Sequence, residues 1–299
     1  MEFGLHESIP IFAGGLGVLA GDHLKAASNL DLPLVGVGLL YRQGYFRQLL
    51  DRNGWQQEMY PETDLYTLPM NRAEDGEGND LRISVTGPEG EMFADVWQIR
   101  VGRIRLYLLD TQVEENPPEI RKITAQLYVG EAKIRLAQEV LLGIGGMRAL
   151  VALGMYPKVC HMNEGHSSFS GIERLALTMR TYHVDLKTAL EIVPRSTVFT
   201  THTPVAAAHD EFPAKMVKPY LQPFQKTLGA TVDEMLSWGQ AEGEGPEGDF
   251  SMFALGLHMA QYCNGVSRLH GEVARKMWSH LWPNRPDEET PISYVTNGI

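Results

Sequence analysis

The chain has 299 residues, of which 43% are hydrophobic and 21% charged, as is usual for a globular protein with one large or two smaller domains. Its formal net charge of −11 argues against partners such as nucleic acid or an anionic membrane surface, whose binders usually carry a basic patch. No apolar run reaches the roughly 18 residues of a membrane-spanning helix, and no signal peptide is visible. The two cysteines, Cys160 and Cys263, are expected to be free thiols in the cytoplasm.

The first predicted element is a helix over residues 18–29, directly after the segment GGLG at 14–17. Three glycines in four positions leave bare backbone just ahead of the helix start. This serves either loop geometry alone or contact between backbone amides and a ligand. The apolar run at 34–41 then predicts a buried strand, and Asn53-Gly54 predicts the turn of a β-hairpin.

Residues 60–112 alternate apolar and polar side chains between turn signals, and they predict an antiparallel β-meander that elaborates the main sheet. From residue 117 onwards, strands and helices are expected to alternate. A long helix is predicted over 119–142, with Gly-Ile-Gly-Gly at 143–146 as its C-cap and a short helix following. Further strands are expected near 158–162, 196–201, 264–267 and 292–296, and further helices after 167 and 185 and near 213–225, 252–262 and 268–278.

This alternation predicts an α/β fold with a doubly wound, mostly parallel, Rossmann-like sheet. Residues 1–299 are expected to form one domain with the meander at 60–112 as an insertion. The glycine-rich and acidic segment 239–249 is expected to be a solvated loop or a mobile gate. Both ends of the chain look cut, so it is expected to be a fragment of a longer polypeptide.

Polar residues and glycines gather where the predicted strands end, in four clusters at 14–17, 163–166, 201–203 and 296–297. The first cluster belongs to the set if residues 1–4 are the tail of a strand. Ligands of a doubly wound sheet bind just past the carboxyl ends of its strands, so the clusters predict a cleft. Their His, Glu, Asn and Thr side chains suit sugar hydroxyls, and amides at a helix start suit an anion. Turn capping alone is the alternative for any single cluster.

Several other chemistries are disfavoured. His161 and His166 are five residues apart and His202 and His209 seven, so neither pair has the four-residue spacing of helical zinc ligands, and no metal is expected. There is no G-x-S-x-G of a serine hydrolase, and GGLG fits neither a P-loop nor G-x-G-x-x-G. Glu164 alone does not make the carboxylate pair of a glycosidase.

Five segments carry a resemblance to a known family, in order along essentially the whole chain. They are MEFGLHESIPIFAGGLG with its continuation to residue 48, HMNEGHSSF, VFTTHTP, NGVSRLHGEVARKMW and VTNGI. In them the chain resembles the amino-terminal portion of the α-glucan (glycogen/maltodextrin) phosphorylases, in their shorter bacterial and archaeal form. The resemblance implies a retaining glycosyltransferase of carbohydrate metabolism. It would cleave terminal α-1,4-linked glucosyl units with phosphate to give glucose 1-phosphate, and the chain would form half of a two-domain fold.

The resemblance also implies roles for individual residues. The catalytic positions are His202 and Gly15. His202 would contact the glucosyl unit through its side chain, with its carbonyl near the positive charge that develops at the anomeric carbon. The amides of Gly14 and Gly15 would lie near phosphates. The implied substrate-binding residues are Leu16, Glu164, His166, Asn297 and Glu2.

The family binds pyridoxal phosphate as a Schiff base. Its lysine and the basic residues that hold the substrate phosphate lie in a carboxy-terminal domain expected to be absent here, so no covalent cofactor and no activity are expected of the isolated chain. The implied partners are glucan, phosphate, glucose 1-phosphate and the missing domain, and a homo-oligomer stays open. Residues 206–211 (AAAHDE) depart from the commoner family form, and Glu211 receives no role.

Two alternatives stay open. The chain could act as a stand-alone, non-catalytic glucan-binding module. It could also be a nucleotide-sugar glucosyltransferase of the glycogen-synthase type, which shares the glycine-rich loop. That type usually has a lysine just before the glycines, where this chain has Phe12 and Ala13, and it lacks the THTP and NEGH contexts.

Overall fold

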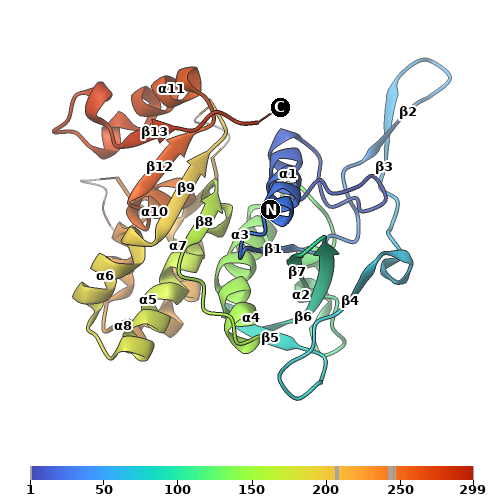
Figure 1. The fold of residues 1–299 in the computed structure, drawn as a ribbon, viewed down its shortest axis with the longest axis horizontal. Helices are drawn as coiled ribbons and strands as arrows, with labels where there is room; N and C mark the ends of the chain where they lie inside the picture. Colours follow the sequence, from blue (N-terminus) through green and yellow to red (C-terminus); the bar gives the residue numbers. More distant parts are fainter. Residues whose placement is uncertain (1, 206–208, 242–244, 246, 299) are drawn as a thin grey trace. The chain divides into compact units, whose positions relative to one another are not determined.

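A computed structural model describes residues 2–205, 209–241, 245 and 247–298. The chain is a mixed α/β protein with parallel and antiparallel sheets (Figure 1), which confirms the predicted fold class at this level. It divides into two compact units, one made of residues 1–85 and 91–154 and the other of residues 86–90 and 155–299. None of the helices in the described ranges is long and apolar enough to cross a membrane.

The first unit contains a mixed five-stranded sheet in the order β1-β7-β6-β4, with β5 also paired to β6. The β1–β7 pair is parallel, and β6 runs antiparallel to both β7 and β4. The strands are β1 (Val35–Leu39), β4 (Met70–Arg72), β5 (Arg82–Gly87), β6 (Gly90–Val101) and β7 (Ile104–Asp110). The antiparallel strands expected over 60–112 are therefore present. Together with β1 they form one sheet, which is separate from the parallel sheet of the second unit, so they do not elaborate one main sheet. β7 takes β1 as a parallel neighbour because it is apolar and buried along most of its length.

The helical part of the first unit differs from the prediction of one helix over 119–142. The short α2 (Pro118–Arg121) and a 3₁₀ turn end at Thr124, and α3 (Ala132–Val140) starts only after a non-helical stretch. Gly-Ile-Gly-Gly is no C-cap, because a π-helical turn, Leu141–Gly145, continues directly into α4 (Gly146–Ala152). A Cβ on Gly146 would lie 2.8 Å from Cγ1 of Val37 on β1, so this glycine serves helix–strand packing.

The amino-terminal segment forms no strand between residues 2 and 14, contrary to expectation. It packs instead on α1 (Gly15–Asn29), which begins three residues earlier than predicted. The Gly4 amide donates to the carbonyl oxygen of Gly17 at 2.7 Å. A Cβ on Gly21 would lie 2.2 Å from the carbonyl oxygen of Gly4, so close backbone contact excludes a larger residue there.

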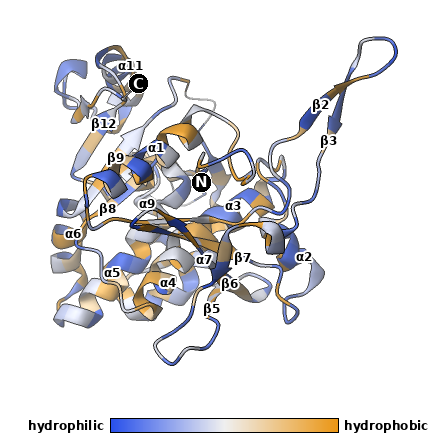
Figure 2. Cartoon of the chain, turned by 45° about the vertical axis from the view of Figure 1, so that its right-hand side comes forward, coloured by the Kyte–Doolittle hydropathy of each residue, from blue (hydrophilic) through white to orange (hydrophobic). Residues whose placement is uncertain are grey.

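The predicted hairpin is confirmed. Strands β2 (Arg47–Leu50) and β3 (Gln56–Met59) pair antiparallel around Gly54, whose φ of +79° explains the glycine. Figures 1 and 2 show this hairpin projecting away from the sheet of its unit.

The second unit contains a parallel four-stranded sheet in the order β13-β12-β9-β8. Parallel neighbours need crossover connections, and helices supply them. The strands are β8 (Cys160–Asn163), β9 (Thr197–Thr201), β12 (Tyr262–Gly265) and β13 (Ile292–Tyr294). The crossover helices include α5 (Phe169–Tyr182), α6 (Leu186–Arg195), α7 (Ala214–Leu221), α8 (Gln225–Leu228), α9 (Val232–Ser237), α10 (Met252–His258) and α11 (Arg268–Trp278).

The strands and helices expected after residue 158 are thus confirmed, including the Asp185 cap, which accepts from the Thr188 amide at 2.9 Å. Elements that were not predicted include α9 and the two-stranded antiparallel ribbon of β10 (Glu211–Pro213) and β11 (Asp249–Ser251). The expected loop at 239–249 falls partly outside the described residues, at 242–244 and 246, as do residues 206–208 of the AAAHDE segment. The unit's core centres on Phe199, Phe253 and Trp278, with the last two rings stacked at 3.8 Å.

Candidate ligand-binding site

Three of the four predicted clusters follow strands of one sheet. Asn163 at the end of β8 is in register with Thr200, and Thr201 at the end of β9 is in register with Gly265. The Asn297 amide donates to the carbonyl oxygen of Val266 at 3.0 Å, just past β12. The residues after β8, β9 and β13 therefore share the carboxyl edge of this sheet. The fourth cluster, GGLG, belongs to the other unit and follows no strand in the described residues.

Glu164 organises this edge. Its side chain is buried, and its φ of +60° is unusual for a residue other than glycine. Its Oε1 accepts hydrogen bonds from the amides of His202 at 2.5 Å and Thr203 at 2.8 Å and from Oγ1 of Thr201 at 3.4 Å. These amides lie beyond the end of β9, so the carboxylate acts as the acceptor that a neighbouring strand would otherwise supply.

The His202 imidazole is half-buried, and its Nε2 lies 2.9 Å from Oδ1 of Asn163. A carboxamide oxygen can only accept, so Nε2 carries the proton. Burial lowers the pKa of His202 more than the carboxylate of Glu164 raises it, and the nearby His270 and His166 lower the pKa further. In the resulting neutral ring, Nδ1 is an acceptor suited to a hydroxyl group.

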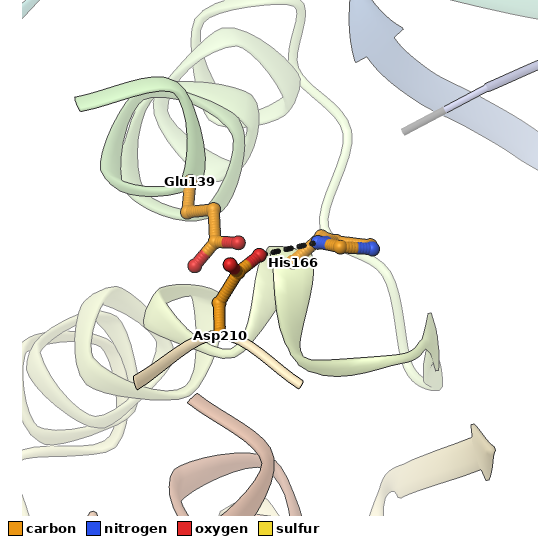
Figure 3. A group of neighbouring side chains, drawn as sticks. All are labelled: Glu139, His166 and Asp210. Atoms are coloured by element: carbon orange, nitrogen blue, oxygen red, sulfur yellow. Dashed lines mark ion pairs between the residues drawn. The ribbon is translucent and has the colours of Figure 1, made fainter. Parts of the chain in front are cut away.

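His166 and Asp210 form a second polar pair in this unit. The Nδ1 atom of His166 lies 3.7 Å from Oδ2 of Asp210, and Figure 3 shows the two side chains directed toward one another. His161, by contrast, lies on β8 with an exposed side chain, and its Nε2 lies 2.8 Å from Oγ1 of Thr200. Asn297 lies in the exposed stretch after β13, together with Thr296.

His209, whose spacing from His202 does not suit helical zinc ligands, lies against Glu164. Its Nδ1 lies 3.6 Å from Oε2 of Glu164, and its side chain is buried. Burial lowers the pKa of His209, and the carboxylate of Glu164 and a hydrogen bond to the backbone of Thr203 oppose this shift. Its position in the same connection as His202, seven residues further along, is the signal that could have found it.

In the first unit, Glu2 lies beside the start of α1. Its buried carboxylate accepts at Oε2 from the amides of Ala13 at 2.6 Å and Gly14 at 3.1 Å, and at Oε1 from the hydroxyl of Tyr128. The Gly14 amide is therefore engaged by Glu2. The amides of Gly15 and Leu16 follow in the first turn of α1, where amides have no acceptor within the helix.

Packing requires neither Gly14 nor Gly15. The φ of Gly14 is −134°, Gly15 is helical, and a Cβ on either would meet no heavy atom within 4 Å. Gly17 differs, because its Cβ would lie 2.7 Å from Oε2 of Glu2 and from Cβ of Phe12. The open space at Gly14 and Gly15, next to amides at a helix start, fits the close approach of an anion such as a phosphate group.

Comparison with known proteins agrees with these motifs, although no family model matches the chain. The chain is 44% identical over 300 residues to maltodextrin phosphorylase of Thermococcus litoralis and 44% identical over 311 residues to glycogen phosphorylase of Mycobacterium tuberculosis. It is 38% identical over 298 residues to glycogen phosphorylase of Aquifex aeolicus. Each alignment covers 100% of this chain, which spans 35%, 36% and 42%, respectively, of these relatives.

Proposed function

The chain is similar along its whole length to part of the glycogen and maltodextrin phosphorylases, and we propose that it supplies the glucosyl-binding side of an α-1,4-glucan phosphorylase. The complete enzyme would transfer a terminal glucosyl unit to phosphate with retention, giving glucose 1-phosphate. The finer fold, a doubly wound Rossmann-like arrangement, belongs to this proposal. It is supported by the parallel sheet with helical crossovers in the second unit.

The arrangement around His202 is the observation that carries this proposal. Its neutral ring donates from Nε2 to Asn163 and presents Nδ1 as an acceptor for a glucosyl hydroxyl. Glu164 holds the backbone of His202 and Thr203, and so fixes the peptide group whose carbonyl dipole would face the positive charge at the anomeric carbon. Such preorganised groups stabilise a transition state without reorganising during the reaction.

Pyridoxal phosphate is the cofactor that the family implies, and when bound it would supply a phosphate group as a proton relay. The amides of Gly15 and Leu16 fit a phosphate, because the backbone at Gly14 and Gly15 is open to close approach. We place the cofactor lysine outside these 299 residues. A cytoplasmic location is supported by the two free thiols, Cys160 and Cys263.

Calorimetry with maltoheptaose tests the proposal on the purified chain. We expect saturable binding by the wild type and no change in affinity in His280→Ala. In His202→Ala we expect affinity to fall about tenfold or more, because the sugar contact is lost together with the donor to Oδ1 of Asn163. His280 is exposed and hydrogen-bonds within its own turn, to the carbonyl oxygen of Met277. Equal affinities in wild type and His202→Ala would overturn the role of His202.

Assays of phosphorolysis test the placement of the cofactor lysine and separate the phosphorylase from the stand-alone binding module. The chain alone is expected to release no glucose 1-phosphate from maltoheptaose and phosphate. Release would overturn the placement of the cofactor lysine outside the chain. If the longer polypeptide containing this chain bound glucan but did not catalyse phosphorolysis, the stand-alone binding module would replace the phosphorylase.

A further inference from the structure

His209 is held by packing in the connection between β9 and β10. Its imidazole is packed edge-on against Phe253, at a centroid distance of 4.6 Å and an interplanar angle of 63°, and against Trp278, at 5.0 Å and 71°. Its side chain is 4% exposed. These contacts leave the ring little freedom to rotate, so the direction in which Nδ1 points is set by the aromatic core.

The two oxygens of the Glu164 carboxylate have different surroundings. Oε1 receives the amides of His202 and Thr203 and the hydroxyl of Thr201. Oε2 is buried and, within the described residues, has no hydrogen-bond partner. Nδ1 of His209 faces this oxygen at 3.6 Å, slightly beyond hydrogen-bond length. A buried carboxylate oxygen without a donor is costly, and a small movement of either side chain would supply one.

We propose that His209 is a positioning residue that acts on His202 through Glu164. Its Nδ1–H faces Oε2 and keeps the carboxylate in the orientation in which Oε1 holds the amides of His202 and Thr203. Without that contact the carboxylate can rotate or tilt, and the backbone that carries His202 loses its anchor. The effect on glucan binding rests on the proposed function, whereas the effect on the two amides does not.

A matched set of variants distinguishes this role from simple space filling. His209→Leu retains most of the volume but has no donor. His209→Asn is smaller and polar, but its amide group reaches the place of Nδ1. His209→Gln brings its amide group to the place of Nε2 instead. Positioning predicts that only the Asn variant preserves the site, whereas space filling predicts that the Leu variant does so best.

The direct readout is the ¹H–¹⁵N spectrum of the chain with ¹⁵N-labelled histidine and threonine. In His209→Leu and His209→Gln we expect the amide signals of His202 and Thr203 to move upfield and their hydrogen exchange to accelerate about tenfold, as the hydrogen bonds to Glu164 weaken. In His209→Asn both signals should stay near their wild-type positions. Unchanged signals in His209→Leu, or a larger change in Asn than in Leu, would overturn the proposal.

Maltoheptaose calorimetry then measures the functional consequence. Affinity should fall about tenfold in the Leu and Gln variants and stay within about threefold in the Asn variant. If the wild type binds no maltoheptaose, the proposed function fails, and the amide signals still decide the role of His209. If His209→Leu does not fold, as judged by circular dichroism, the comparison of Gln with Asn decides.

Discussion

Nε2 of His202 donates to Oδ1 of Asn163 across 2.9 Å, and this bond joins the ends of two neighbouring strands of the parallel sheet. It selects the tautomer of His202 and leaves Nδ1 as the acceptor. The adjacent residue, Glu164, fixes the backbone of His202 through its carboxylate. The last residue of β8 and the residue that follows it thus control the ring and the main chain of the first residue after β9.

The bond between His202 and Asn163 predicts the effect of a charge at position 163. In Asn163→Asp a carboxylate replaces the neutral acceptor and favours the charged imidazolium, so the pKa of His202 should rise from its lowered value. An NMR titration of the His202 ring proton measures this change. Asn264→Asp is the control, because Asn264 lies on β12 and bonds to Thr200, so the rise there should be smaller. If the pKa of His202 were unchanged in Asn163→Asp, the hydrogen bond between His202 and Asn163 would be contradicted.

The backbone conformation of Glu164 predicts an unusual order of stabilities. Both Glu164→Ala and Glu164→Gly lose the carboxylate, but only glycine adopts a φ of +60° without steric strain. Glu164→Gly should therefore be more stable than Glu164→Ala by about 1–3 kcal/mol in urea unfolding.

Glu173 serves as the control for this comparison, since it is buried within α5. There alanine should be the more stable replacement, by about 1 kcal/mol, because glycine weakens a helix. The same order at both positions would show that the backbone at Glu164 is unstrained.

Two glycines at the start of α1 should respond oppositely to alanine. A Cβ on Gly15 meets open space in a helical position, so Gly15→Ala should leave the free energy of unfolding unchanged or raise it by up to about 1 kcal/mol. A Cβ on Gly17 would collide with Glu2 and Phe12, so Gly17→Ala should lower it by about 1–3 kcal/mol. Urea denaturation of both variants measures the difference, and a destabilised Gly15→Ala would refute the open surroundings of Gly15.

Three histidines predict that acid weakens the fold. Burial lowers the pKa values of His202, His209 and His258, so below their unfolded value of about 6.5 the unfolded chain binds more protons than the native one. The contribution of these histidines to the free energy of unfolding is therefore complete above that value. The free energy of unfolding should fall as the pH is lowered from about 7.5 to about 5.5. Urea denaturation at these two pH values tests this. The fall should be shallower in His209→Asn, and stability that rises on acidification would refute the prediction.

Much of the fold follows from local patterns. The hairpin turn at Asn53-Gly54, the Asp185 cap and the alternation of strands and helices after residue 158 all depend on residues close together in the chain. The clustering of polar residues after β8, β9 and β13 was also predictable, because parallel strands end at one edge of their sheet.

Contacts between distant segments decided the rest. The glycines at 143–146 predicted the end of a helix. The helix continues instead, because Gly146 packs against Val37. The helix α1 starts at Gly15 because Glu2 and Gly4 pack against its first turns. In both cases the space beside a glycine is defined by a residue far along the chain or outside the element, and periodicity holds no information about it.

The same distinction applies to the site. The residue pattern was enough to predict which chemical groups lie at the sheet edge, because parallel strands end at one edge. Which of these groups contact one another follows only from the tertiary structure. Asn163 hydrogen-bonds to the His202 ring, Glu164 accepts from the His202 amide, and His209 lies against Glu164. These pairings depend on strand register and on the packing of His209 against Phe253, which arise only when distant segments are brought together.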